Sequence, residues 1–353
     1  MASAWIVSVN MGYGHERAAF GLADLAHGGI ITANHYPGIP NTDKQMWRQS
    51  RQAYEVISRL QPLPVIGQPL FDIMDHFQQI APFYPRRDLS KPTLQLREIY
   101  HLIEQRGLGR HLIEKLARKC PLPFISTFFI PAFAAEVHGY PSDIYLVVCD
   151  ADMSRAWAPL DPKKSRIKYF APTGRVVERL KLYGVRPEQI YLTGFPLPKS
   201  NIGGPGGEII KKDLMERICQ LDPQGIFCEK YDKTLIQELG QSVCQANTKR
   251  QLTLTFCVGG AGAQKQLGID ILTSLRTCLG QKRLRLNLES GTHKPVARFF
   301  LDHVKRLRLN SLLGSNLFVH AYDNRPAYFR GFTKTLRTTD ILWTKPSELS
   351  FYT

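Results

Sequence analysis

His15 is the residue whose type and position in this sequence best suit acid–base chemistry. It follows an apolar run, Trp5–Val9, and lies in a turn with Gly12 and Gly14, just before the apolar helical face of Glu16–Ala26. A strand, a glycine turn and a helix can hold an anion, because glycines let the backbone approach and the helix N-terminus presents free N–H groups. Imidazole exchanges a proton near pH 7. The alternatives are a plain βα turn and a histidine that only packs at the helix start.

A second pattern of the same kind lies far along the chain. Leu252–Val258 predicts a strand and Gln264–Leu279 a helix, and the turn between them contains Gly259, Gly260 and Gly262. These glycines would offer N–H groups to a diphosphate, and a merely tight turn is the alternative. Two such patterns favour a protein of two halves, each of which binds one of the two substrates of a reaction.

The elements that must position these turns alternate between strand and helix. Further strands are predicted at Ile30–Asn34, Phe124–Ile130, Ile144–Val148, Ile167–Phe170, Gln189–Thr193, Leu284–Leu288, Leu317–His320 and Ile341–Trp343. Helices are predicted at Asp43–Leu60, Pro92–Ala117 (interrupted near Gly107–Gly109), Ala132–Val137, Gly174–Tyr183, Glu208–Gln220, Lys233–Ala246, Ala297–Leu307 and Ala327–Thr335. This alternation predicts the α/β class, with doubly wound, Rossmann-like sheets.

An abrupt change in composition suggests where one domain ends. Gly194–Gly207 is rich in Gly and Pro, which is typical of an interdomain boundary. We therefore predict an N-terminal Rossmann-like domain over 1–196, a linker and helical lead-in over 197–250, and a C-terminal Rossmann-like domain over 251–353. Ser347–Thr353 looks like the start of another helix, so we expect the C-terminal domain to be incomplete.

The composition of the chain indicates what kind of partner it binds and in which cellular compartment it lies. The chain has 353 residues, and 46 Lys and Arg against 30 Asp and Glu give a net charge of +16, which predicts an anionic partner. Its 7 cysteines are scattered without a Cys-x-x-Cys pair, which argues against a disulfide framework or a zinc site. No apolar run reaches the roughly 18 residues of a membrane span. We expect a cytoplasmic protein, at most peripheral on the inner face of the membrane, with no metal.

Several motifs resemble those of known glycosyltransferases. Asp143–Asp150, followed by Trp157, is similar to the strand ending in Val-Thr-Asp, then His and Trp, of the diacylglycerol glycosyltransferases. The resemblance continues through Tyr169–Pro172 and through Gln189–Pro196, whose Thr-Gly-Phe-Pro is similar to the start of the donor domain in that family. Gly12–Ala19 resembles the family's Gly-x-Gly-His-x-x-Ala.

Two later segments extend the resemblance in the same order. Gly259–Ala263 is similar to the Gly-Gly-Ser-x-Gly turn of the peptidoglycan lipid II GlcNAc transferase. Asp340–Pro346 is similar to the Ala-Asp strand that precedes a donor-binding helix start. The resemblance implies the GT-B fold, in which two Rossmann-like domains face a cleft, and a nucleotide-sugar donor, UDP-linked in the first place.

The resemblance also implies roles for particular residues. His15 would be the general base, and Asp150 would orient His15 or the acceptor, or serve as the base itself. N-capping after the strand is the alternative for Asp150 and Asp152, and a solvated side chain is the alternative for each lysine. The remaining implied residues are Gly12, Gly14, Asp152 and Trp157 on the acceptor side and Gly259, Gly260, Gly262, Lys199 and Lys345 on the donor side.

The sequence also departs from the family pattern. Ser154 stands where the diacylglycerol enzymes have His, and Ala261 replaces the hydroxyl residue of the glycine turn. Pro198 stands where an Arg usually follows, with Lys199 one step on, and Pro346–Glu348 replaces a Gly-rich turn. These departures leave the donor sugar and the acceptor open.

The expected function is transfer of a sugar from a nucleotide-sugar donor to an acceptor hydroxyl by direct displacement with a general base, without a cofactor. The resemblance suggests a lipid at an anionic membrane surface as the acceptor. The alternatives are a nucleotide-sugar epimerase of the same fold and a non-catalytic nucleotide-binding relative. We expect no nucleic acid partner, because the basic runs near Arg283 and Lys305 contain Leu rather than aromatic residues. A dehydrogenase is disfavoured because Arg17 stands where the third glycine of Gly-x-Gly-x-x-Gly belongs.

Overall fold

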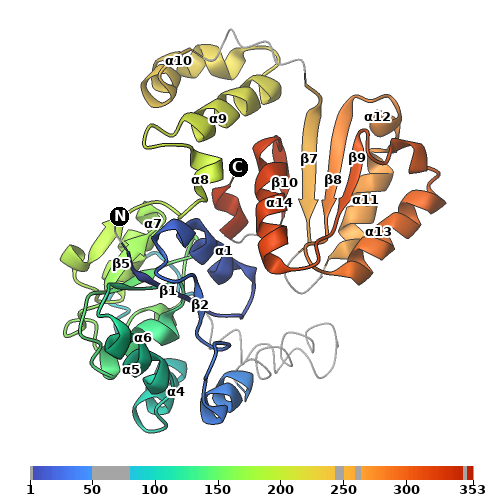
Figure 1. Ribbon diagram of the computed structural model, residues 1–353. Coiled ribbons are helices and arrows are strands. Elements are labelled where there is room, and N and C mark those ends of the chain that lie inside the picture. Colours follow the sequence, from blue (N-terminus) through green and yellow to red (C-terminus); the bar gives the residue numbers. More distant parts are fainter. Residues whose placement is uncertain (1–2, 50–79, 243–249, 259–263, 345–347, 353) are drawn as a thin grey trace. The chain divides into compact units, whose positions relative to one another are not determined.

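The chain forms two α/β units, each built on a parallel sheet, as the alternation of strands and helices predicts (Figure 1). The first unit is Met1–Pro196 and the second is Leu197–Thr353. The computed structural model describes residues 3–49, 80–242, 250–258, 264–344 and 348–352.

The sheet of the first unit has 6 strands in the order β2-β1-β3-β4-β5-β6, all parallel. Trp5 and Val7 of β1 lie in the larger core, whereas Ile6 points to the other face and packs with Ala19. Burial on both faces explains why β1 is a continuous apolar run. The strands are β1 (Trp5–Ser8), β2 (Ile31–Thr32), β3 (Phe124–Ser126), β4 (Ile144–Val147), β5 (Lys168–Ala171) and β6 (Ile190–Leu192).

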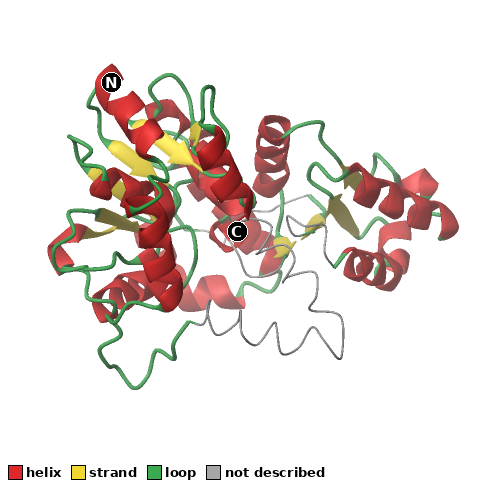
Figure 2. Ribbon diagram, turned by 90° about the horizontal axis from the view of Figure 1, so that it is seen from below, coloured by secondary structure: helices red, strands yellow, loops and turns green. Residues whose placement is uncertain are grey.

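Helices cover both faces of this sheet, and Figure 2 shows the strands of the first unit between them. Leu96, Leu116 and Phe133 belong to the core with Val7, so α4, α5 and α6 share that face. Helix α1 packs on the opposite face through Ala19. The helices are α1 (Tyr13–Gly21), α4 (Leu94–Glu104), α5 (Arg110–Lys119), α6 (Phe129–Val137) and α7 (Gly174–Leu182), with 3-10 turns η1 (Ala23–Leu25), η2 (Arg155–Trp157) and η3 (Pro187–Gln189).

One predicted strand ends earlier in the structure, and one predicted interruption of a helix is present. The predicted strand Phe124–Ile130 stops at Ser126, because the Ser126 hydroxyl bonds the backbone of Phe128 and turns the chain into α6. The predicted break in Pro92–Ala117 is confirmed. It occurs at Gly109, whose φ of 81° only glycine adopts readily, and an added Cβ there would lie 2.9 Å from Ala134.

The sheet of the second unit has 4 parallel strands in the order β10-β7-β8-β9. The strands are β7 (Leu252–Cys257), β8 (Leu284–Glu289), β9 (Leu317–His320) and β10 (Ile341–Trp343). The helices are α8 (Lys199–Ile202), α9 (Glu208–Leu221), α10 (Ile226–Leu239), α11 (Lys265–Ser274), α12 (Arg276–Gly280), α13 (Lys294–Arg306) and α14 (Arg325–Arg337), with 3-10 turns η4 (Asn310–Leu312) and η5 (Glu348–Phe351). Helix α10 begins seven residues before the predicted Lys233, after Gly225 in the left-handed region.

The two faces of the second sheet differ in chemistry. Leu286 and Leu288 of β8 pack with Phe300 of α13 in the apolar core. The residues between and after them, Asn287 and Glu289, are also buried, but they point to the opposite face. One face of this sheet is therefore apolar, and the other carries buried polar groups.

Candidate functional site

His15 lies at the carboxyl end of β1, in the first turn of α1. The turn before it depends on Gly12, which has φ 116° and ψ 168°. An added Cβ at Gly12 would meet nothing within 4 Å, so the requirement for glycine is conformational rather than steric. Gly14 is the second residue of the helix, one position before His15. The local sequence thus places the imidazole at the edge of the sheet where ligands of α/β proteins bind.

Thr127, which sequence reasoning did not identify, fixes the orientation of His15. The Nδ1 atom of His15 lies 2.9 Å from the backbone oxygen of Thr127, and the Thr127 hydroxyl donates to the backbone oxygen of His15 at 2.8 Å. A carbonyl oxygen only accepts hydrogen bonds, so Nδ1 carries the proton of this contact. In the neutral ring the lone pair is then on Nε2.

Two aromatic rings lie beside the imidazole. The ring centroid of His15 lies 4.7 Å from that of Phe128 and 5.9 Å from that of Trp157. Trp157 is buried and also contacts Phe129, with centroids 5.3 Å apart. Trp157 therefore helps to form an apolar wall beside His15, which restricts the ring to few orientations.

The carboxyl ends of three neighbouring strands bring the site together. His15 follows β1, Thr127 follows β3, and Asp150 follows β4 as a half-buried residue. The buried Cys149 Sγ donates to the same Thr127 oxygen, at 3.4 Å. The predicted residues His15 and Asp150 thus lie at one edge of one sheet.

The strand order identifies this edge further. From β1 the chain passes to β2 on one side, and it then crosses to β3 on the other side of β1. The β1/β3 position is therefore the topological switch point, where crevices open in doubly wound sheets. The pair His15 and Thr127 lies at that switch point.

Asp152, predicted on the acceptor side, takes part in a largely buried ion pair. Its carboxylate accepts from Arg179 at 2.8 and 2.9 Å and from Arg175 at 2.8 Å, and the Arg179 side chain is only 1% exposed. Burial alone would raise the pKa of Asp152, but the hydrogen bonds from Arg179 and Arg175 outweigh it and lower the pKa. These contacts give Asp152 a structural role, and its predicted role on the acceptor side stays a prediction.

An aromatic ring from a distant segment supports this ion pair. The guanidinium carbons of Arg175 and Arg179 lie 4.5 and 5.0 Å from the ring centroid of Phe83. Arg179 also donates to the backbone oxygen of Ala81 at 2.9 Å. The cluster therefore ties the 81–83 segment to α7 and to the turn that follows β4.

Most predicted donor-side residues lie outside the described residues. This applies to Gly259, Gly260, Gly262 and Lys345. Lys199 is the first residue of the short helix α8. Their roles stay predictions.

The structure adds a buried group at the carboxyl edge of the second sheet. Glu289 at the end of β8 is fully buried, and the Tyr322 hydroxyl donates to its Oε1 at 3.4 Å. Burial, together with the charge of Glu289, raises the pKa of Tyr322. Burial also lowers the pKa of His320, whose backbone oxygen accepts from the Ser290 hydroxyl at 2.6 Å. The sequence signal was the alternation Leu-Arg-Leu-Asn-Leu-Glu in a parallel strand, where continuous apolar residues are the norm.

A cavity lies near this group. It measures about 300 Å³, and Tyr322, Lys294, Arg298 and Asp323 are among the residues that line it. Lys294 and Asp323 form an ion pair at 2.8 Å.

The switch point of the second sheet is at β7/β10, because the chain passes from β7 through β8 to β9 and then returns to the other side of β7.

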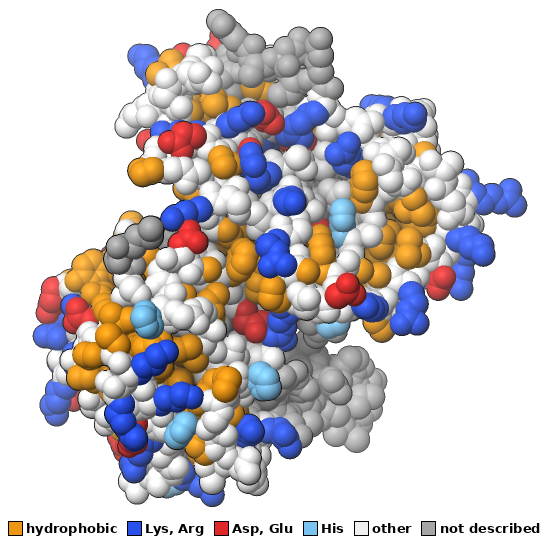
Figure 3. Space-filling model, in the orientation of Figure 1, with side chains coloured by type: hydrophobic (Ala, Val, Ile, Leu, Met, Phe, Trp, Pro, Cys, Tyr) orange, Lys and Arg blue, Asp and Glu red, His pale blue; other side chains and the backbone are white. Residues whose placement is uncertain are grey.

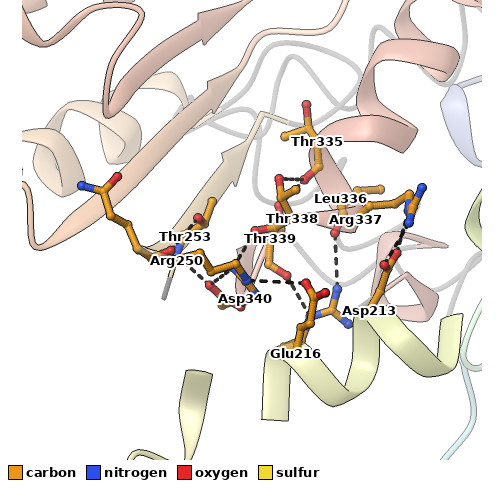
Figure 4. A network of polar contacts seen from close by, with 12 residues as sticks. Asp213, Glu216, Arg250, Thr253, Thr335, Leu336, Arg337, Thr338, Thr339 and Asp340 are labelled. Carbon is orange, nitrogen blue, oxygen red and sulfur yellow. Dashed lines mark hydrogen bonds and ion pairs between the residues drawn. The ribbon is translucent and has the colours of Figure 1, made fainter. Parts of the chain in front are cut away.

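A polar network at the opposite edge of the second sheet has a structural role (Figure 4). Asp340, fully buried as a side chain, pairs with Arg250 and accepts from the Thr253 N–H at 2.8 Å. Arg217 of α9 donates to the backbone oxygens of Thr339 at 2.8 Å and Leu336 at 3.3 Å. Thr253 and Asp340 lie at the amino ends of β7 and β10, so this network anchors α9 at the edge away from the carboxyl ends of the strands.

Comparison with known proteins gives one family match. Residues 232–353 match the family model of a domain of unknown function, DUF6938. The match begins within α10 and includes all four strands of the second sheet. No curated protein matches the chain.

Within the part of the chain that the structure describes, no helix combines the length and apolar character needed to cross a membrane. Across the same residues, no group of three or more His, Cys, Asp or Glu side chains is arranged to hold a metal ion.

Proposed function

We propose that this protein is a glycosyltransferase of the GT-B type, in which the first unit binds the acceptor and the second binds a nucleotide-sugar donor. A UDP-sugar is the first candidate for this donor. The observation that carries the proposal is the pair of His15 and Thr127 at the β1/β3 switch point. It presents a histidine of defined tautomer at the edge where α/β proteins bind ligands.

The chemistry follows from the tautomer. Nε2 of His15 accepts the proton of the acceptor hydroxyl as its oxygen attacks the anomeric carbon of the donor. The bond between that carbon and the diphosphate oxygen breaks, and the nucleoside diphosphate leaves with the electron pair. The imidazolium that forms keeps its Nδ1–H on the Thr127 oxygen, 2.9 Å away, and the carbonyl dipole stabilises the new charge.

Two further observations support the assignment of the donor to the second unit. Its sheet is parallel, with a switch point at β7/β10, so the segment between β7 and α11 starts at the ligand edge. That segment contains the three predicted donor glycines, whose N–H groups would bind the diphosphate. Asp150, which follows β4, the strand next to β3, is proposed to orient the acceptor or the imidazole.

The test is to incubate the full chain with a panel of UDP-, GDP- and dTDP-sugars and a range of lipid and soluble acceptors. Release of the nucleoside diphosphate measures turnover. We expect release with a UDP-sugar that depends on an acceptor. His15→Ala should lower kcat by about 10²–10⁴, the usual contribution of a positioned general base. His101→Ala is the matched control, because His101 is exposed on α4 of the same unit.

The outcomes separate the alternatives. Interconversion of a UDP-sugar without an acceptor would indicate an epimerase, and binding without turnover would indicate a non-catalytic relative. If no nucleotide sugar shifts the thermal unfolding of the chain, the transferase proposal is wrong. If His15→Ala keeps activity within about tenfold of the wild type, His15 is not the base.

A further inference from the structure

A groove on the outer face of α5 carries an unusual set of side chains. It measures about 480 Å³ and is lined by Gly38, His111, Lys115, Arg118 and Lys119. Figure 3 shows several Lys and Arg side chains, interspersed with hydrophobic ones, over the region where Figure 1 places α4 to α6. None of the five residues that line the groove is acidic.

The spacing of these residues explains how one helix produces the groove. His111, Lys115, Arg118 and Lys119 lie at positions i, i+4, i+7 and i+8, which share one face of a helix. The opposite face carries buried apolar residues of the core. The helix dipole accounts for Arg118 and Lys119 in the last turn, but not for His111 and Lys115 in the first two turns.

Specific contacts hold these side chains in place. Lys115 Nζ donates to the Pro37 oxygen at 2.8 Å and lies 5.6 Å from the ring centroid of Tyr36. His111 Nδ1 lies 2.9 Å from the Tyr36 hydroxyl. When that hydroxyl donates, the neutral imidazole carries its proton on Nε2, which makes Nε2 a donor.

The far end of the groove is held in a similar way. Lys119 Nζ lies 5.3 Å from the ring centroid of Trp5, and Arg118 pairs with Glu114 at 2.7 Å. Gly38, with φ 84°, contributes backbone without a side chain to the lining of the groove. Restrained cations lose less side-chain entropy when they bind an anion than free ones do.

We propose that this groove binds phosphate groups, with His111, Lys115, Arg118 and Lys119 as donors to their oxygens. An elongated row of cations suits a ligand with at least two anionic charges, such as an oligophosphate or a phosphorylated headgroup. The groove is separate from the His15 site, and the inference does not depend on the proposed transfer reaction.

The first experiment is titration of the full chain with inorganic tripolyphosphate by calorimetry. We expect saturable binding by the wild type and by the control Lys163→Glu/Lys164→Glu, two exposed lysines of the same unit outside the groove. The affinity of Lys115→Glu/Lys119→Glu for tripolyphosphate should be lower by at least about tenfold, because two charge-assisted hydrogen bonds become repulsive contacts. Equal binding by the two double variants, or no binding by the wild type up to millimolar concentration, overturns the proposal.

Two further measurements keep the result unambiguous. Arg118→Gln removes one charge at an exposed position and should weaken binding with an unchanged thermal unfolding midpoint, which covers the case of a double variant that fails to fold. Co-sedimentation with phosphatidylcholine vesicles, with and without phosphatidic acid, separates the two sources of phosphate. Groove-dependent binding to phosphatidic acid vesicles identifies a lipid headgroup, and groove-dependent binding of tripolyphosphate alone identifies a soluble phosphate compound.

Discussion

His15 and Thr127 are joined by two hydrogen bonds that run in opposite directions. The ring of His15 donates to the backbone of Thr127, and the side chain of Thr127 donates to the backbone of His15. The two residues are 112 positions apart, so this link also connects the start of α1 to the end of β3. The orientation of the proposed base is therefore set by the same contact that joins two neighbouring segments of the fold.

The Thr127 hydroxyl provides a direct test of that link. Thr127→Val keeps the shape of the side chain but leaves the His15 carbonyl without this donor. We therefore expect the free energy of unfolding to fall by about 1–3 kcal/mol. Urea unfolding measures the loss. Thr127→Ser keeps the hydroxyl and should recover most of it. Equal stability of the Val and Ser variants would show that the hydrogen bond contributes nothing.

The Asp152 ion pair should make stability depend on pH. The folded pKa of Asp152 is lowered, so its pair with Arg179 adds stability that is fully present above the unfolded pKa of about 3.9 and is lost as pH falls through the folded pKa. Asp152→Asn leaves the buried Arg179 unpaired and should cost at most about 3–5 kcal/mol at neutral pH.

Urea unfolding at a series of pH values checks this prediction. The difference between wild type and Asp152→Asn should shrink below about pH 4. Asp161→Asn, which removes an exposed pair with Lys164, is the control and should change little. A difference that stays constant down to pH 2 would mean that the loss comes from something other than the carboxylate charge.

Gly268 is expected to respond to Ala in the direction opposite to most helical glycines. A Cβ at Gly268 in α11 would lie 2.8 Å from Phe256 and 2.9 Å from Phe300. Gly268→Ala should therefore destabilise the protein by about 1–3 kcal/mol, as overpacked cores do. Gly280→Ala in α12 meets nothing within 4 Å and should be neutral or stabilising by up to about 1 kcal/mol. Thermal unfolding of the two variants decides, and a stabilised Gly268→Ala would contradict the close approach of α11 to β7.

Arg217 should control the stability of a helix that it does not belong to. Arg217→Met removes the donors to the Thr339 and Leu336 oxygens at the end of α14, so this helix and β10 should exchange amide hydrogens faster. Hydrogen–deuterium exchange by mass spectrometry reports each segment separately. Lys212→Met, exposed on the same helix α9, should leave the exchange unchanged. Unchanged exchange in Arg217→Met would show that the carbonyls find other donors.

The strand pattern of the sequence predicted both sheets, because apolar runs bounded by turn residues are local signals. The predicted end of a strand was wrong where a side chain redirects the backbone, as Ser126 does at the end of β3. Within the candidate site, the position of His15 at the end of β1 followed from its glycine turn. The contact with Thr127 did not, because it spans 112 residues and no local pattern encodes it. The partners of Asp152, Arg175 and Arg179, were not predicted either, because they lie more than 20 residues away in α7.

The contacts of α9 with the end of α14 lie outside the span of the family match. The family match starts at residue 232, whereas Asp213 and Arg217 lie upstream of it in α9. Asp213 binds Arg337 through two hydrogen bonds of 2.7 and 3.1 Å. A fragment cut at residue 232 would lose both partners of the α14 terminus and expose its carbonyls to water. The span of the family match is thus shorter than the compact unit, and an independently expressed second unit should begin at Leu197.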